Sequence, residues 1–216
     1  MKAFIFDLDG VLVDTARHHF LAWSEVCKAL HIPFSEKENE KLKGIDRRSS
    51  LKIILKLGNV TLSDEEFEFW LKKKNDIYTN MIENLDRNDV FEGVIPLFEA
   101  LKEKNIKIGL GSASKNAKMI LKKLDIANYF DAIVDGHMTT LGKPDPQVFL
   151  LNADKLGVSV EKCTVFEDAE AGIDAAITAN MKVVGIGSDP SIKHADIVFN
   201  SIANVDLNKV LALYNS

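Results

Sequence analysis

The chain has 216 residues, 46% of them apolar and 27% charged, which is the composition of an ordinary water-soluble globular protein. A formal net charge of −5 without a dense basic cluster argues against nucleic-acid binding, and the apolar start is interrupted too early, at Asp7, for a signal peptide or membrane span. Cys27 and Cys163 form no Cys-x-x-Cys pair, so we expect free thiols and a cytoplasmic protein.

The first predicted element is a buried strand over Ala3–Phe6, followed at once by Asp7 and Asp9. Ligands of open α/β sheets bind just beyond the carboxyl ends of strands, where these carboxylates fall. Two carboxylates this close repel unless a cation such as Mg²⁺ lies between them. One could then attack phosphorus as a nucleophile while the other serves as general acid/base. The alternatives are a solvated turn or a calcium loop, but Val11 and Leu12 stand where a calcium loop needs further oxygen ligands and its glycine.

Residues 15–89 show helical periodicity and no convincing strand. Helices are predicted around Phe20–Leu30, over 35–42, over 47–57, and from a capping box at Ser63 and Glu66 onwards. The segment is neutral, with 13 Lys and Arg against 13 Asp and Glu. We interpret residues 15–89 as a helical cap inserted after the first strand.

After Gly93 the sequence alternates between predicted strands and helices. The strands are Ile106–Leu110, Ala132–Val134, Cys163–Phe166, Val183–Ile186 and Asp196–Phe199; the helices lie near 94–104, 115–127, 145–157, 170–180 and 203–214. This alternation predicts an α/β fold with a doubly wound, Rossmann-like parallel sheet, formed by residues 1–14 and 90–216.

Polar groups follow the later strands as well. Ser112 comes after the strand ending at Leu110, and helix N-terminal amides behind it would make a phosphate site. Ser114 could instead only cap the next helix. Lys143 lies in a Gly-Lys-Pro-Asp-Pro loop whose prolines restrict its direction, although most lysines are simply solvated. Glu167 and Asp168 end a further strand.

The string Asp7-Leu-Asp-Gly-Val-Leu-Val-Asp-Thr15 resembles the first motif of the haloacid dehalogenase-like phosphotransferases. Ser112, Lys143 and Glu167-Asp168 match the family's three later motifs in order. The resemblance implies that Asp7 is the nucleophile, Asp9 the general acid/base, and Ser112 and Lys143 the groups that hold the phosphoryl group. It also implies Mg²⁺ with four candidate ligands: Asp7, Asp9 through its backbone carbonyl, Glu167 and Asp168.

Within that family the chain is most similar to sugar-phosphate mutases, through Thr15 with His19 and Trp23, Lys43-Gly44-x-x-Arg47, and Ser112 to Asn116. The similarity implies conversion of β-glucose 1-phosphate to glucose 6-phosphate through β-glucose 1,6-bisphosphate, which also acts as primer. The implied substrate-binding residues are His19, Trp23, Lys43, Gly44, Arg47, Lys74, Ser114, Lys115 and Asn116. Of these, Arg47 and residues 114–116 would hold the phosphate that is not transferred. Ala169-Glu170 departs from the pattern, where a hydroxyl and an amide are expected.

Several alternatives stay open from sequence. Lys74 could snorkel rather than line a cleft, and His19 could be a structural histidine. A sugar-phosphate phosphatase would need the same four motifs, whereas a receiver-type signalling module fits neither the cap nor the chain length. The expected partner is a small phosphosugar, with no nucleic acid and no membrane, and a moving cap suits a monomer.

Overall fold

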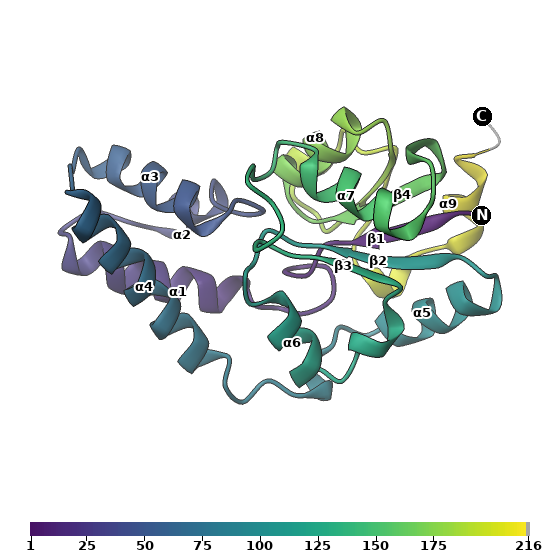
Figure 1. The fold of residues 1–216 in the computed structure, drawn as a ribbon, viewed down its shortest axis with the longest axis horizontal. Helices are drawn as coiled ribbons and strands as arrows, with labels where there is room; N and C mark the ends of the chain where they lie inside the picture. The colour runs from purple at the N-terminus through teal and green to yellow at the C-terminus, as the bar shows by residue number, and fades with distance from the viewer. Residues whose placement is uncertain (215–216) are drawn as a thin grey trace.

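The computed structural model describes residues 1–214 and is built on one parallel sheet with a group of helices beside it (Figure 1). The sheet order is β3-β2-β1-β4-β5-β6, and each neighbouring pair is parallel. The strands are β1 (Ala3–Phe6), β2 (Lys107–Gly111), β3 (Ala132–Val134), β4 (Cys163–Glu167), β5 (Lys182–Ile186) and β6 (Ile197–Phe199). Because the chain winds from β1 first to β2 and later to β4, the topological switch point lies at the end of β1.

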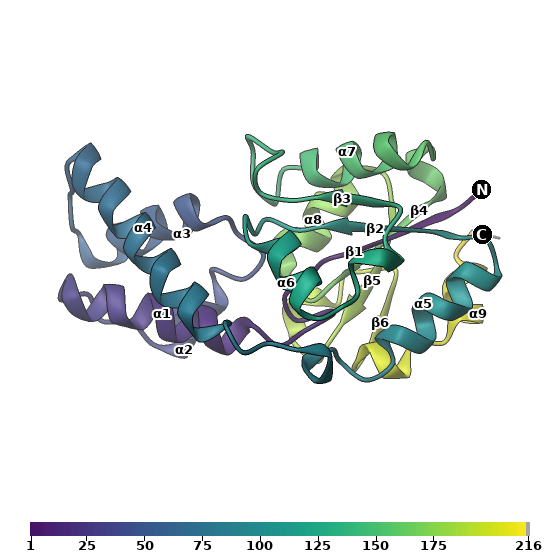
Figure 2. The same ribbon diagram turned by 60° about the horizontal axis from the view of Figure 1, so that its bottom comes forward.

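Helices cover both faces of the sheet (Figures 1 and 2). On one face lie α7 (Gln147–Leu156) and α8 (Glu170–Thr178); on the other lie α5 (Val94–Glu103), α6 (Ala117–Lys123) and α9 (Leu207–Ala212). This arrangement confirms the predicted α/β fold with a doubly wound parallel sheet.

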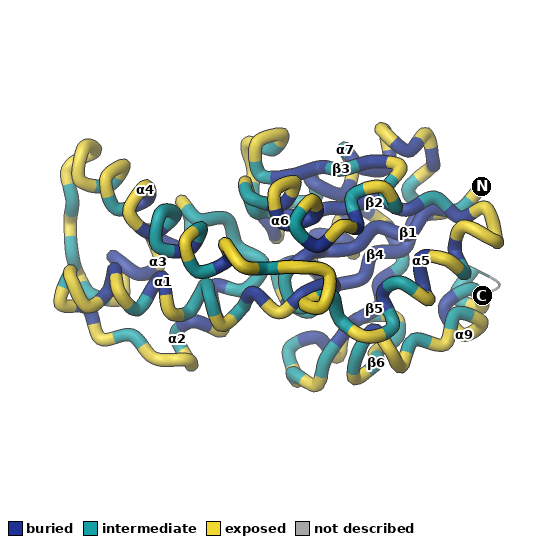
Figure 3. Tube along the Cα trace, turned by 90° about the horizontal axis from the view of Figure 1, so that it is seen from below, coloured by how far each residue is buried: buried dark blue, intermediate teal, exposed yellow. Residues whose placement is uncertain are grey.

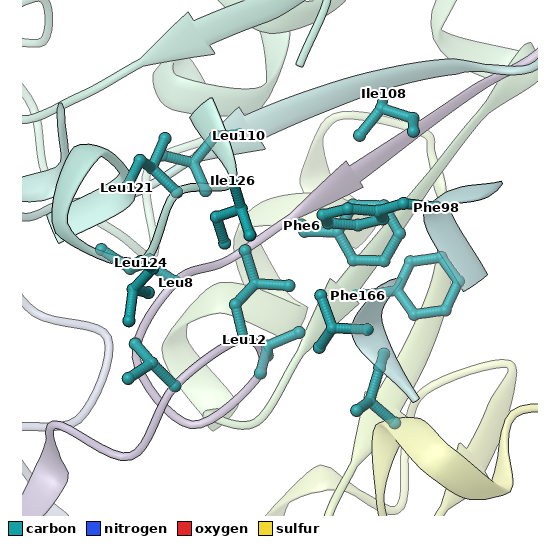
Figure 4. Close-up of a cluster of buried hydrophobic side chains, with 14 of the residues drawn as sticks. Phe6, Leu8, Leu12, Phe98, Ile108, Leu110, Leu121, Leu124, Ile126 and Phe166 are labelled. Carbon is teal, nitrogen blue, oxygen red and sulfur yellow. The ribbon is translucent and has the colours of Figure 1, made fainter. Parts of the chain in front are cut away.

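The alternation of side chains along β1 divides the core into two layers, and strands β1 to β5 are buried along most of their length (Figure 3). Phe6 points to the α5 side, where its ring stacks on Phe166 at 4.5 Å between centroids and meets Phe98 edge-on at 5.1 Å (Figure 4). Ile5 points to the other side, into the layer that contains Phe149 of α7. Burial on both faces holds β1 rigidly, and so fixes the residues that follow it.

After β1 the chain leaves the sheet and forms four helices, which lie beside the carboxyl edge of the sheet (Figure 1). They are α1 (Ala16–Ala29), α2 (Glu36–Glu40), α3 (Arg47–Gly58) and α4 (Asp64–Met81). Asp46 caps α3 by accepting from two backbone amides, and Ser63 and Glu66 form the expected capping box of α4. The two connections of this insertion to the sheet run side by side, since Phe91 N donates to Leu12 O at 2.9 Å.

Some predicted boundaries are wrong. The helix expected over 115–127 ends at Lys123, because Asp125 adopts a left-handed backbone with φ 53°. The helix expected over 203–214 is a short 3₁₀ turn, Ile202–Asn204, followed by α9, which Asp206 caps. Among the described residues, none of the helices combines the length and the apolar character needed to cross a membrane.

Candidate active site

The candidate site begins where three central strands end together. Phe6 of β1 is in register with Leu110 of β2 and with Phe166 of β4. The residues that follow these strands therefore meet at one edge: Asp7, Ser112, Glu167 and Asp168. Sequence reasoning placed them at separate strand ends, and the parallel register brings them together.

Lys143 connects two of these strand ends from inside the protein. Its ammonium donates to Asp7 Oδ1 at 2.6 Å and also to Glu167 Oε1, and all three side chains are buried. Burial alone would lower the pKa of Lys143, but the charges of Asp7 and Glu167 and their hydrogen bonds raise it above its ordinary value. Lys143 is therefore a permanent cation held against Asp7.

Three carboxylates at this edge form a group suited to a divalent cation. Oxygen atoms of Asp7, Glu167 and Asp168 lie within 4.8 Å of one another. Desolvation and the charges of Glu167 and Asp7 raise the pKa of Asp168 well above its ordinary value, and no group among residues 1–214 donates a hydrogen bond to its carboxylate. One lysine does not balance three carboxylates, and an oxygen donor set is what Mg²⁺ prefers, so these residues fit the ion.

Two glycines leave the space that this group needs. Gly10 has φ 85°, and a Cβ there would overlap the carboxylate of Asp168. Gly172, in the first turn of α8, lies against Glu167, and a Cβ there would overlap the Glu167 carboxylate. The backbone thus approaches both acidic side chains more closely than a side chain would permit.

Asp9 lies outside this carboxylate group and has different neighbours. Its Oδ1 accepts a hydrogen bond from Thr15 and lies 3.9 Å from His19 Nε2. Burial and the charge of Asp7 raise the pKa of Asp9 to about 6, against the lowering effect of the Thr15 hydrogen bond. Its backbone amide donates to Asp7 Oδ2 at 3.0 Å, which orients the Asp7 side chain. A carboxyl group with this pKa suits proton transfer near neutral pH.

The loop after β2 is held by a chain of short-range hydrogen bonds. Ser112 Oγ accepts from Ser114 N at 3.1 Å, and Ser114 Oγ accepts from Asn116 N at 3.2 Å. Ser114 thus bonds the amide of Asn116, the residue before α6, and does not cap the helix itself; it also lines the cavity described below. Ser112 is buried.

The insertion supplies the opposite wall. Arg47, the first residue of α3, directs its Nη1 towards Leu71 O of α4 at 3.5 Å. Lys43 pairs with Glu40 at 2.6 Å. Gly44 has φ 72°, and its backbone passes close to Ala169 at the start of α8.

Lys74 does not snorkel to solvent. It is 2% exposed, lies over the rings of Trp23 and Tyr78, and its Nζ is 2.9 Å from His19 Nδ1. Burial, followed by the charge of Arg47, lowers the pKa of Lys74 to about 7. Leu71, Lys74 and Tyr78 form the buried face of α4, whereas its other apolar residues Phe67, Trp70 and Met81 are only partly buried.

One cavity of about 640 Å³ lies between the insertion and the sheet edge. It brings together thirteen of the fifteen predicted site residues: Asp7, Asp9, His19, Trp23, Lys43, Gly44, Arg47, Lys74, Ser114, Lys115, Asn116, Lys143 and Asp168. The other two, Ser112 and Glu167, are buried and are not among the residues that line it. This volume suits a ligand of the size of a phosphosugar.

Sequence reasoning did not single out Asn75 of α4, which also lines the cavity. Its Oδ1 accepts a hydrogen bond from Asn116 Nδ2 at 3.0 Å. An asparagine one position from Lys74 was the available signal, but asparagines within helices are commonly solvated.

Comparisons with known proteins agree with this geometry. Residues 1–180 match the haloacid dehalogenase-like hydrolase family. A β-phosphoglucomutase of Bacillus subtilis is 44% identical over 96% of this chain and 92% of its own. A crystal structure of β-phosphoglucomutase from Clostridium difficile superposes with a TM-score of 0.96 and 41% identity, over 100% of this chain and 97% of that one. A phosphorylated carbohydrates phosphatase of Thermotoga maritima is 32% identical over 84% of this chain and 83% of its own.

Proposed function

Since the chain belongs to the haloacid dehalogenase-like hydrolase family, we propose that it is a Mg²⁺-dependent phosphomutase that interconverts β-glucose 1-phosphate and glucose 6-phosphate. The observation that carries the proposal is that one cavity contains two sets of phosphate-binding groups. Asp7 and Lys143 stand at the sheet edge, and Arg47 and residues 114–116 line the same space. A hexose bisphosphate has a phosphate for each set.

In this proposal Asp7 is the nucleophile. A carboxylate oxygen of Asp7 attacks the phosphorus of a bound phosphosugar or bisphosphate, an O–P bond to Asp7 forms, and the bond from phosphorus to the sugar oxygen breaks. Lys143 pairs with Asp7, orients its side chain and offers positive charge beside the transferring oxygens. Mg²⁺ held by Asp7 and Asp168, with Glu167 beside them, would neutralise charge on the phosphoryl group.

Asp9 would then move the proton. When phosphorus leaves the sugar, the oxygen that remains needs a proton, and a protonated Asp9 supplies it. In the return step an ionised Asp9 removes the proton of the hydroxyl that attacks the phospho-Asp7. Thr15 and His19 hold the Asp9 side chain near Asp7 but outside the carboxylate group that Asp7 forms with Glu167 and Asp168.

The second set of groups explains how one site treats both ends of the sugar. Arg47 can hold a phosphate bidentately, and Ser114, Lys115 and Asn116 line the cavity with it. The β-glucose 1,6-bisphosphate formed after one transfer must bind again in the reverse direction, so that its other phosphate faces Asp7. A primer of this bisphosphate would keep Asp7 phosphorylated between turnovers.

A phosphatase acting on sugar phosphates is the second candidate, supported by the 32% identity to the Thermotoga maritima phosphatase. It would use Asp7, Asp9 and Lys143 in the same way but admit water to the phospho-Asp7. If Arg47 gripped the distal phosphate of a bound phosphosugar and the cavity closed around it, water would be excluded and the mutase favoured.

Parallel time courses of two products test the proposal. Purified protein is given β-glucose 1-phosphate and Mg²⁺, with and without trace β-glucose 1,6-bisphosphate, and glucose 6-phosphate and inorganic phosphate are measured together. We expect glucose 6-phosphate to form after a lag that the primer removes, and phosphate to appear far more slowly. α-Glucose 1-phosphate is the matched control for the anomer. Phosphate release as fast as isomerisation would refute the mutase and leave the phosphatase.

A further inference from the structure

Asn75 links the insertion to the phosphate-binding loop. It lies on α4, and its Oδ1 accepts from Nδ2 of Asn116, which precedes α6, at 3.0 Å. Both side chains line the cavity, and both residues are half-buried. The bond therefore joins the two walls between which a phosphosugar would bind.

The hydrogen bond sets the direction of the Asn116 carboxamide relative to that of Asn75. Asn75 presents a carbonyl oxygen, so the end of Asn116 that meets it must be the amide. An amide nitrogen has two N–H groups, and the one not used by Asn75 remains as a donor. Rotation of the Asn116 carboxamide by 180° would instead bring two carbonyl oxygens together. Without Asn75, either end of Asn116 could face the cavity, and only the N–H end attracts an anion.

The position of Asn75 on α4 extends a pattern along that helix. Leu71 O lies 3.5 Å from Arg47 Nη1, Lys74 is paired with His19, and Asn75 binds Asn116. These positions are spaced so that they share one side of an α-helix. One helical surface thus touches a phosphate-binding arginine of the insertion and a phosphate-binding asparagine of the core.

We propose that Asn75 is a positioning residue that sets the Asn116 amide for the phosphate that is not being transferred. This inference rests on the proposed function, because it assigns Asn116 to a sugar phosphate. Asn75 acts through Asn116 and not on the reacting phosphorus.

The test measures binding and turnover in four proteins: wild type, Asn75→Ala, Asn116→Ala and the double variant. The dissociation constant for glucose 6-phosphate is measured by calorimetry, kcat and KM from isomerisation, and phosphorylation of Asp7 with acetyl phosphate. Loss of one neutral hydrogen bond predicts a rise of about two- to tenfold in Kd and KM for Asn75→Ala. We expect kcat and the acetyl phosphate reaction to stay within about twofold of wild type, since one hydrogen bond far from phosphorus stabilises substrate and transition state alike.

Asn80→Ala is the matched control, because Asn80 is an exposed position of the same helix and carries the same change in helix propensity. This control variant should leave Kd and KM unchanged. If Asn75 acts through Asn116, the double variant binds no more weakly than Asn116→Ala alone. Independent, multiplying effects, or an unchanged Kd in Asn75→Ala, would overturn the inference. A wild-type protein that binds glucose 6-phosphate but does not isomerise it would refute the mutase alone, and one that does not bind it would refute both.

Discussion

Asp7 and Asp9 are two residues apart, yet the fold gives them different neighbours. Asp7 is buried against Lys143 and belongs to the carboxylate group with Glu167 and Asp168. Asp9 turns towards Thr15 and His19 and has a raised pKa of about 6. One carboxylate is paired with a buried cation, and the raised pKa of the other suits proton exchange near neutral pH.

Replacing Asp7 or Asp9 by asparagine should therefore impair different steps of the reaction. Asp7→Asn removes the nucleophile, so no phosphoenzyme forms with any donor. Asp9→Asn should slow isomerisation by roughly 10²–10⁴-fold, the usual contribution of a general acid/base. Acetyl phosphate, whose leaving group needs no proton, should still phosphorylate Asp9→Asn with a much smaller loss.

Radiolabel incorporation from acetyl phosphate and product time courses measure the two reactions. Asp14→Asn, at an exposed position of the same loop, is the control and should retain wild-type rates. Equal losses in both reactions for Asp9→Asn would contradict its role in proton transfer.

At the scale of elements, the start of α8 is built around Glu167. Its Oε2 accepts from the amides of Asp168 and Ala169 at 3.0 and 3.2 Å, while Oε1 accepts from Lys143. The first turn of α8 packs directly on this carboxylate through Gly172. The first turn of α8, the end of β4 and Lys143 thus all contact one acidic side chain, that of Glu167.

Gly172→Ala tests that packing. The new methyl group would displace the Glu167 carboxylate and remove one charged partner of Lys143. Loss of a charge-assisted hydrogen bond of about 1.5–3 kcal/mol predicts a fall in kcat/KM of roughly ten- to a hundredfold. In a Glu167→Ala background, Gly172→Ala should not lower kcat/KM further, because no carboxylate is left to displace. Wild-type kcat/KM in Gly172→Ala would show that the close approach is unnecessary.

For the whole molecule, the carboxylate group couples metal binding to stability. Burial raises the pKa of Glu167 from 4.5 to about 7, with Lys143 opposing and Asp7 adding to the shift. At pH values between 4.5 and about 7, Glu167 is protonated in the folded protein but ionised in the unfolded chain. The metal-free protein therefore loses this contribution to stability as pH rises through that range.

Mg²⁺ should reverse this loss, because it binds the ionised carboxylates. At a concentration about a hundredfold above its Kd the ion adds about 2.7 kcal/mol to the native state, which raises Tm by about 5–10 °C for a chain of this size. We expect the rise to be larger at pH 7.5 than at pH 5, where protons compete. Chelation should abolish turnover, and added Mg²⁺ should restore it.

Thermal scans with Mg²⁺ or chelator at the two pH values measure the effect. Asp168→Asn should lose the Mg²⁺-dependent rise, whereas Asp174→Asn, on the surface of α8, should keep it. An equal rise in Asp168→Asn would place the metal elsewhere.

The sequence by itself determined the fold class and the residues at the strand ends. Both are encoded locally: apolar runs of strand length alternate with helical periodicity, and three of the four motifs lie directly at the end of a strand. Asp7, Ser112 and Glu167-Asp168 were recognisable for that reason, whereas Lys143 lies in a loop beyond β3 and was recognisable from the Gly-Lys-Pro-Asp-Pro string around it. Helical periodicity without strand patterns likewise predicted the run of helices between β1 and β2.

Only the tertiary structure decided which of these groups meet and how. The parallel register brought Asp7 and Glu167 to the same lysine, and desolvation there raised the pKa of Glu167, which depends on neighbours far apart in the chain. Packing of α4 against α1 buried Lys74 beside His19, and the approach of α4 to the sheet paired Asn75 with Asn116. Such contacts depend on the rotation of a helix about its axis and its distance from the sheet, which local periodicity does not specify.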